Sequence, residues 1–194
     1  MAAERAGHAG LSVTLFEKKA MGGVCLNEGC IPTKTLLYSA KMYENALHGD
    51  KYGVFGDNIR FDYGKMLSRK KKVVRKLVSG VESKMKVNRV TVIKGDAHVE
   101  KRSSEGIEVT CNGERFTGRN LLVCTGSESA VPPIPGLKEA GDVVVTNREI
   151  LEMTDRPRSL VVIGGGVIGM EFASFYNSLG TEVTVVEMLP EILA

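Results

Sequence analysis

The sequence lacks several features that would place it in a special class of protein. It has no apolar run long enough to cross a bilayer, and no apolar segment behind a basic start that would mark a secretory leader. It has no tandem repeat and no low-complexity segment. Its net charge of +3 is too small to indicate nucleic acid or a membrane surface as a partner. These absences predict a cytoplasmic protein, although an organellar address stays open because the native N-terminus looks absent.

Cysteine and histidine are scarce, with four and three residues among 194. Four cysteines do not make the dense disulfide framework of a small secreted domain. No CxxC pair or histidine cluster supplies a ligand set, so no metal site is expected. Cys111 and Cys124 fall in apolar, strand-like stretches and are interpreted as buried core thiols. Cys25 and Cys30 lie in a different setting, described below.

The first two thirds of the chain contain candidate strands and helices. A buried strand is expected over residues 11–16, and it closes on an acid. A long helix is expected over about residues 62–86, with the basic run at 69–76 as a solvated face. Asn112-Gly113 predicts a hairpin turn between two short strands, and a further buried strand is expected over residues 121–124.

The last third begins after the stiff segment VPPIPG at residues 131–136, which is typical of a boundary between domains. A strand at 160–163, a glycine-rich turn, a helix and a strand at 182–186 then follow one another. This order predicts the start of a βαβ unit.

The glycine-rich turn reads Gly164-Gly165-Gly166-Val167-Ile168-Gly169, and Glu187 ends the next strand. This context, rather than the glycines alone, indicates a dinucleotide-binding fingerprint. Gly164 permits the tight turn, Gly166 lets a pyrophosphate approach the backbone, and Gly169 lets helix and strand pack closely. The helix N-terminus favours phosphates. Glu187 can accept hydrogen bonds from ribose hydroxyls and repels a 2′-phosphate, which favours NAD over NADP; the alternative is a glycine turn without a ligand.

Cys25 and Cys30 lie in the segment GGVCLNEGCIPTK at residues 22–34, which is expected to be irregular up to a helix that starts near its end. Gly29 gives the backbone the freedom to bring the two sulfurs within disulfide range. The helix N-terminus and the nearby cation of Lys34 favour a thiolate, with Cys30 the better stabilised of the two. The pair can therefore cycle between disulfide and dithiol. Two free thiols, or half of a metal site, are the alternatives.

This segment closely resembles the redox motif of the pyridine nucleotide–disulfide oxidoreductases, and its Leu-Asn and Ile-Pro-Thr-Lys variants look most like the dihydrolipoamide dehydrogenase branch. The stretches VTLFEK, LLVCTGS, VPPIPG and VVIGGGVIGMEFA follow in the family's order along essentially the whole chain. The resemblance implies an α/β, Rossmann-like FAD/NAD(P)-binding, three-layer architecture with a β-meander insert. It implies two incomplete dinucleotide-binding domains: an FAD-binding domain over 1–136, lacking its first strand and glycine turn, and the first part of an NAD-binding domain over 137–194.

The resemblance also implies roles for individual residues. Cys25 corresponds to the outer thiol, which exchanges with a dithiol such as dihydrolipoamide, and Cys30 to the inner thiol, which passes electrons to the flavin. Lys34 corresponds to the lysine near the flavin ring's reactive nitrogen, and Glu171 to the carboxylate that pairs with it. Glu17 corresponds to the acid that holds the FAD adenosine ribose. The other FAD-contacting positions implied by the match are Gly22, Gly23, Cys25, Gly95, Ala97, Thr125, Gly126 and Ser127.

The implied activity is the oxidation of protein-bound dihydrolipoamide with NAD as acceptor. It implies a homodimer that serves the lipoyl domains of 2-oxo acid dehydrogenase or glycine cleavage complexes and takes part in cell redox homeostasis. In the family a His–Glu base pair comes from the partner subunit, and His8, His48 and His98 do not match it. We therefore expect the chain, as a piece lacking both ends, to be inactive alone. The alternatives are another member such as mercuric or glutathione reductase, or a non-catalytic nucleotide-binding fragment.

Overall fold

The computed structural model describes residues 1–193, which divide into two compact units. The units are defined by the contacts between their residues. The domain boundary predicted at residue 136 therefore stays a prediction. Unit 1 comprises residues 1–27 and 75–128, and unit 2 comprises residues 28–74 together with the chain from residue 129 onward.

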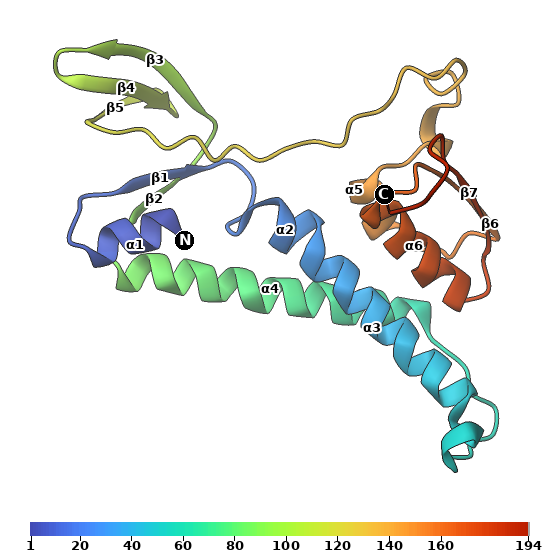
Figure 1. Ribbon diagram of the computed structural model, residues 1–194. Helices are drawn as coiled ribbons and strands as arrows, with labels where there is room; N and C mark the ends of the chain where they lie inside the picture. The colour runs from blue at the N-terminus through green and yellow to red at the C-terminus, as the bar shows by residue number, and fades with distance from the viewer. Residues whose placement is uncertain (194) are drawn as a thin grey trace. The chain divides into compact units, whose positions relative to one another are not determined.

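Helix α4 (Tyr63–Val87) is the long helix of Figure 1, and it confirms the helix predicted over residues 62–86. Its first half belongs to unit 2 and its second half to unit 1. Within residues 1–193, no helix combines the length and the apolar character needed to cross a membrane.

Unit 1 contains helix α1 (Ala2–His8) and a parallel pair of strands. Strand β1 (Thr14–Glu17) pairs with β2 (Thr91–Lys94), with Glu17 opposite Lys94. The strand expected from residue 11 thus begins at Thr14, because the ladder with β2 begins there. Its core is small: the buried side chains of Met21, Met85 and Val90 pack together.

The rest of unit 1 is a three-stranded antiparallel meander, drawn in yellow-green in Figure 1. The predicted turn is confirmed: Asn112 and Gly113 have φ values of +52° and +81°, the left-handed pair that a type I′ hairpin turn requires. Phe16 of β1 makes an edge-to-face contact with Phe116, with ring centroids 5.1 Å apart. The three strands are β3 (Ala97–Ser103), β4 (Gly106–Cys111) and β5 (Glu114–Gly118), in the order β3-β4-β5.

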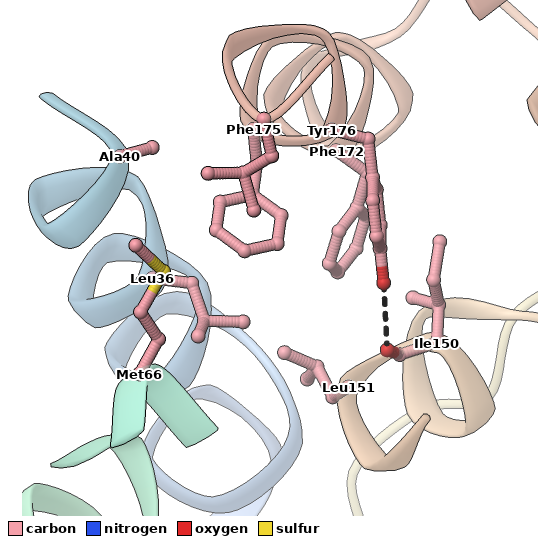
Figure 2. Packing of buried hydrophobic residues seen from close by; sticks show 9 residues of the cluster. Leu36, Ala40, Met66, Ile150, Leu151, Phe172, Phe175 and Tyr176 are labelled. Carbon is pink, nitrogen blue, oxygen red and sulfur yellow. Dashed lines mark hydrogen bonds between the residues drawn. The ribbon is translucent and has the colours of Figure 1, made fainter. Parts of the chain in front are cut away.

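Unit 2 holds the larger core, in which helices α3 (Cys30–Leu47), α5 (Asn147–Glu152) and α6 (Val167–Ser178) pack with the first half of α4. Figure 2 shows the Tyr176 hydroxyl reaching the carbonyl of Ile150, at 3.4 Å. Burial raises the pKa of Tyr176 and, to a lesser degree, that of Tyr63, whose hydroxyl lies 3.1 Å from that of Tyr176. The buried residues of this core are Leu36, Ala40, Met66, Ile150, Leu151, Phe172, Phe175, Tyr176 and Leu179.

The predicted βαβ start is confirmed. Strand β6 (Ser159–Ile163) pairs in parallel with β7 (Glu182–Val186), and α6 connects them. Gly180, at φ +80°, ends the helix in the left-handed conformation that glycine adopts at low cost. Two short 3-10 turns complete the unit, at Gly49–Tyr52 (η1) and Gly141–Val143 (η2).

Four expectations are wrong, and the first two concern the same stretch of the chain. Residues 121–124 form no strand, and Leu122 and Val123 are 68% and 66% exposed. A strand needs a neighbour for its backbone groups, and no described strand pairs with this stretch. Cys124 is consequently exposed, whereas Cys111, in the paired strand β4, is buried as expected.

Lys70 departs from the predicted solvated face, because its side chain is only 2% exposed. It lies one helical turn after the buried Met66 and therefore points to the same side of α4. Its Nζ donates to the carbonyl of Leu151 and, at 2.8 Å, to the Glu152 carboxylate. A basic run on its own does not reveal which of its members finds such a partner.

The stretch between the two cysteines is also more regular than expected, since α2 (Gly23–Glu28) is a short helix. Gly22 and Gly23 have φ values of +112° and +71°, which turn the chain sharply into it. The Asn27 amide closes the turn by donating to the carbonyls of Met21 and Gly23 at 3.2 and 3.0 Å.

Candidate functional site

The glycine turn between β6 and α6 has the geometry of a dinucleotide-binding turn. Gly164 has φ +103°, and its N–H donates to the carbonyl of Val186 at 2.8 Å. A Cβ on Gly169 would lie 2.7 Å from the Gly164 carbonyl oxygen and 2.9 Å from Val162 Cγ1, so helix and strand approach too closely for any side chain. A Cβ on Gly166, by contrast, would meet nothing within 4 Å. The turn is therefore tight on its protein side and open on the side where a pyrophosphate would lie.

The Glu187 carboxylate is fixed at the end of β7. It accepts hydrogen bonds from the Leu189 N–H, at 2.7 Å, and from the Gly165 N–H of the glycine turn. These two backbone donors, Leu189 first, hold the pKa of Glu187 below its usual value. The predicted motif and its predicted acid thus meet in one place. Val167 and Ile168, the first residues of α6, are exposed beside it.

Lys34 and Glu171 are brought together in unit 2 as the sequence predicted. The Lys34 Nζ lies 2.5 Å from Glu171 Oε1, with Lys34 on α3 and Glu171 in the second turn of α6. The two residues are 137 positions apart in the sequence. The ion pair therefore connects the helix that begins at Cys30 to the helix that begins at the glycine turn.

The four cysteines exist in two states. Cys25 and Cys30 are disulfide-bonded, and Cys111 and Cys124 are free, so the bonded two are partners of each other. Cys30 is the first residue of α3. The Gly29 carbonyl just before it accepts from the backbone N–H of Thr33, at 3.2 Å, and from the Thr33 hydroxyl, at 2.7 Å. These bonds close the first turn of α3, which begins at Cys30.

Residues between the two cysteines also contact α5, which sequence reasoning missed. Glu28 forms an ion pair with Arg148, with 2.6 Å between Oε2 and Nε, and its carbonyl accepts from the Asn147 amide at 2.8 Å. No sequence signal connects an acid at 28 with a base at 148. The sequence offered only the capping-box pattern of α5, which the structure contains at Thr146 and Glu149.

In unit 1 the candidate FAD residues gather at the carboxyl end of β1 and β2. The Glu17 carboxylate accepts from the Lys19 N–H at 2.9 Å, and the Glu17 carbonyl accepts from the Gly95 N–H at 3.2 Å. A Cβ on Gly95 would lie 2.6 Å from Cys111 Sγ, so the chain passes too close to β4 for a side chain there. Ala97 opens β3 opposite Cys111. This crowded strand end, with an acid at its edge, fits the adenosine part of a dinucleotide.

The turn at Thr125, Gly126 and Ser127 is exposed. Gly126 has φ +81°, and a Cβ there would lie 3.1 Å from Val24 Cγ2, in the residue before Cys25. This turn and the α2 segment therefore approach each other at a glycine. The cofactor contacts of all these residues stay predictions.

The chain was compared with known proteins. It matches the family described as "Pyridine nucleotide-disulphide oxidoreductase" over residues 1–194. It is 44% identical to a dihydrolipoyl dehydrogenase of Acholeplasma laidlawii, covering 100% of this chain and 57% of that protein. It is 42% identical to a dihydrolipoyl dehydrogenase of Chlorobaculum parvum, covering 99% of this chain and 41% of that protein. The chain thus spans about half the length, or less, of these relatives.

Comparison with solved structures gives similar folds. The copper(II) complex of the HOCl-induced flavoprotein disulfide reductase RclA from Escherichia coli superimposes with a TM-score of 0.81 at 29% identity, over 98% of this chain and 40% of that one. LpdA from Mycobacterium tuberculosis gives a TM-score of 0.82 over 97% of this chain and 42% of that one; at 23% identity it shows the fold. The predicted Rossmann-like architecture is confirmed. The chain belongs to the pyridine nucleotide-disulphide oxidoreductase family.

Proposed function

We propose that this chain is the part of an NAD-linked dihydrolipoamide dehydrogenase that contains the redox disulfide and the NAD-binding turn. The observation that supports this most directly is the Cys25–Cys30 disulfide in front of α3, followed after one turn by Lys34 in its ion pair with Glu171. A disulfide at the start of a helix is suited to exchange, because the helix N-terminus stabilises the departing thiolate.

The exchange runs in two balanced steps. One thiolate of dihydrolipoamide attacks the sulfur of Cys25, the S–S bond to Cys30 breaks, and Cys30 leaves as a thiolate. The second substrate thiol then attacks the substrate sulfur of this mixed disulfide, and Cys25 leaves as a thiol. Lipoamide is released, two electrons have passed to the protein, and Cys25 and Cys30 are a dithiol.

The residues described above would hold two cofactors. FAD would lie against Glu17, Gly22, Gly23, Cys25, Lys34, Gly95, Ala97, Thr125, Gly126 and Ser127, and NAD against residues 164–169 and Glu187. When bound, FAD supplies the two-electron acceptor that connects the dithiol to NAD. Lys34, in its ion pair with Glu171, would place its positive charge near the flavin ring. The Glu187 carboxylate would accept hydrogen bonds from the adenosine ribose of NAD. It would repel the 2′-phosphate of NADP.

The proposed partners are the lipoyl domains of 2-oxo acid dehydrogenase or glycine cleavage complexes, and the proposed parent protein is a cytoplasmic homodimer. The support is the name of the relatives, dihydrolipoyl dehydrogenase, which fits a dithiol substrate carried on such a domain.

The test is an anaerobic exchange of the oxidised chain with dihydrolipoamide, quenched with an alkylating agent and read by peptide mass. Cys25 and Cys30 should gain alkyl groups only after dihydrolipoamide is added, and glutathione at the same thiol concentration should reduce them less. Cys25→Ser is the matched variant, in which no disulfide is available to reduce. In parallel, a visible spectrum after incubation with FAD reports flavin binding, and calorimetry compares NAD with NADP.

A chain whose disulfide survives dihydrolipoamide contradicts the proposed reaction. A chain that binds NADP more tightly than NAD would instead favour an NADP-linked member such as glutathione reductase. A colourless chain that exchanges thiols and binds NAD would restrict the proposal to those two steps for this piece.

A further inference from the structure

Glu28 lies in the middle of the cysteine-containing segment, residues 22–34, and contacts two residues of helix α5. Glu28 ends α2 and precedes Gly29 and Cys30. Its carboxylate lies 2.6 Å from Arg148 Nε, and its carbonyl accepts from the Asn147 amide at 2.8 Å. Both side chains of the ion pair are half-buried, at 26% exposed for Arg148 and 28% for Glu28, so solvent screens the pair less than it would a surface pair.

The helix that provides these two contacts is fixed at both ends. At its start, Glu149 accepts from the Thr146 N–H at 2.7 Å in the capping box. At its end, the buried Lys70 Nζ donates to the carbonyl of Leu151 and to Glu152. A six-residue helix without such contacts would fray, and Leu151 in the core adds to the restraint. Helix α5 is therefore held in place at both ends, and so are the Asn147 and Arg148 side chains that contact Glu28.

We propose that Arg148 and Asn147 are positioning residues for the redox disulfide, and we call their two contacts with Glu28 the α5 clamp. This inference rests on the proposed function, because it concerns the same cysteine pair. The clamp fixes both the side chain and the backbone two residues before Cys30. When the disulfide is reduced, a clamped segment keeps the two thiols near each other, and an unclamped one lets them separate.

The consequence is thermodynamic. The equilibrium between disulfide and dithiol depends on how often the two free thiols meet, which is their effective concentration. Holding Glu28 restricts the reduced segment without straining the oxidised one, so the clamp stabilises the disulfide. Loss of the clamp should make Cys25 and Cys30 easier to reduce.

The test is an anaerobic equilibrium of the whole chain with mixtures of reduced and oxidised glutathione, read by alkylation and peptide mass. The reaction is balanced: two glutathione thiols reduce one Cys25–Cys30 disulfide and leave as one glutathione disulfide. Arg148→Gln should shift the equilibrium constant toward the dithiol by up to about fivefold, since the shift cannot exceed the free energy of the ion pair itself. Asn147→Ala should shift it in the same direction by about threefold, as for one lost hydrogen bond.

The matched control is Arg115→Gln, which removes another Arg–Glu ion pair, 2.8 Å from Glu108 in the β-meander. It should leave the equilibrium constant unchanged. The charge swap Glu28→Arg with Arg148→Glu should recover most of the wild-type value, which a general loss of folding would not do. The swap also keeps the test decisive if Arg148→Gln alone folds poorly.

Two failures are distinguishable. If the wild-type chain forms no Cys25–Cys30 disulfide in oxidised glutathione, the proposed function fails and the clamp fails with it. If the wild-type chain titrates normally but Arg148→Gln and Asn147→Ala match it, only the clamp is overturned, even where these variants lower the unfolding temperature.

Discussion

Strands β1 and β7 each lead into an acid, Glu17 as the last residue of β1 and Glu187 directly after β7, yet the two acids are held differently. Glu17 accepts from the N–H of Lys19, two residues on, and Glu187 likewise accepts from the N–H of Leu189. Glu187 also accepts from Gly165, 22 residues earlier, in the glycine turn. The local bond is what any acid at the end of a strand can form. The long-range bond joins Glu187 to the glycine turn, so the residues proposed to bind NAD meet within this chain.

The largest expected effect comes from the turn that Glu187 contacts. Gly169→Ala would place a Cβ 2.7 Å from the Gly164 carbonyl oxygen, so we expect a loss of about 2 kcal/mol in the free energy of unfolding, together with a loss of NAD binding. A Cβ at Gly166 would meet nothing within 4 Å, so Gly166→Ala should cost only about 1 kcal/mol, for the loss of a preferred helix N-cap residue, while NAD binding falls.

Denaturant unfolding and NAD calorimetry on the two variants separate these effects. Equal stability losses would mean that Gly166 is a packing glycine like Gly169. Unchanged NAD binding in Gly166→Ala would mean that the open side of the turn does not face the pyrophosphate.

The next effect separates the two acids directly. Glu187→Gln should weaken NAD binding by about tenfold, because a carboxylate accepts hydrogen bonds from ribose hydroxyls more strongly than an amide does. It should also reduce the preference for NAD over NADP. Glu17→Gln, at the end of the other strand, is the control and should leave NAD binding unchanged. If both variants bind NAD equally weakly, Glu17 and Glu187 do not differ in their role in NAD binding.

The smallest effect is a pH dependence at Glu187. Its folded pKa lies below the ordinary 4.5, because Leu189 and Gly165 donate to the carboxylate. Its contribution to stability is therefore complete above pH 4.5 and is lost as the pH falls through the lower, folded value. The wild-type chain should unfold at a higher temperature than Glu187→Gln at about pH 7, and the difference should shrink as the pH falls below 4.5. A difference that persists at low pH would show that it does not come from the carboxylate.

Elements with a strong local pattern were predicted from the sequence. The β6–turn–α6–β7 unit and the Asn112-Gly113 hairpin each depend on glycines at fixed positions, which limit the backbone to a few conformations. The pairing of Lys34 with Glu171 was also predicted, but from the resemblance to a family rather than from the residues themselves.

The predictions that were wrong concern residues whose environment depends on partners distant in the sequence. Residues 121–124 have the composition of a strand, but a strand forms only where another strand accepts its hydrogen bonds. Lys70 was expected in solvent because its neighbours are basic, yet the end of α5 offers it a carbonyl and a carboxylate. The Glu28–Arg148 ion pair was missed for the same reason. Periodicity and turn chemistry carry no information about which remote groups meet.

The exposed stretch of residues 120–134, which contains no helix or strand, has a consequence for handling the protein. A protease needs an accessible segment that it can draw into its cleft, and Leu121, Leu122 and Val123 are exposed in this stretch. Limited digestion with a protease that prefers large apolar residues should therefore cut here first. The cut would divide the chain into a piece that keeps the cysteine pair and a piece that keeps the glycine turn.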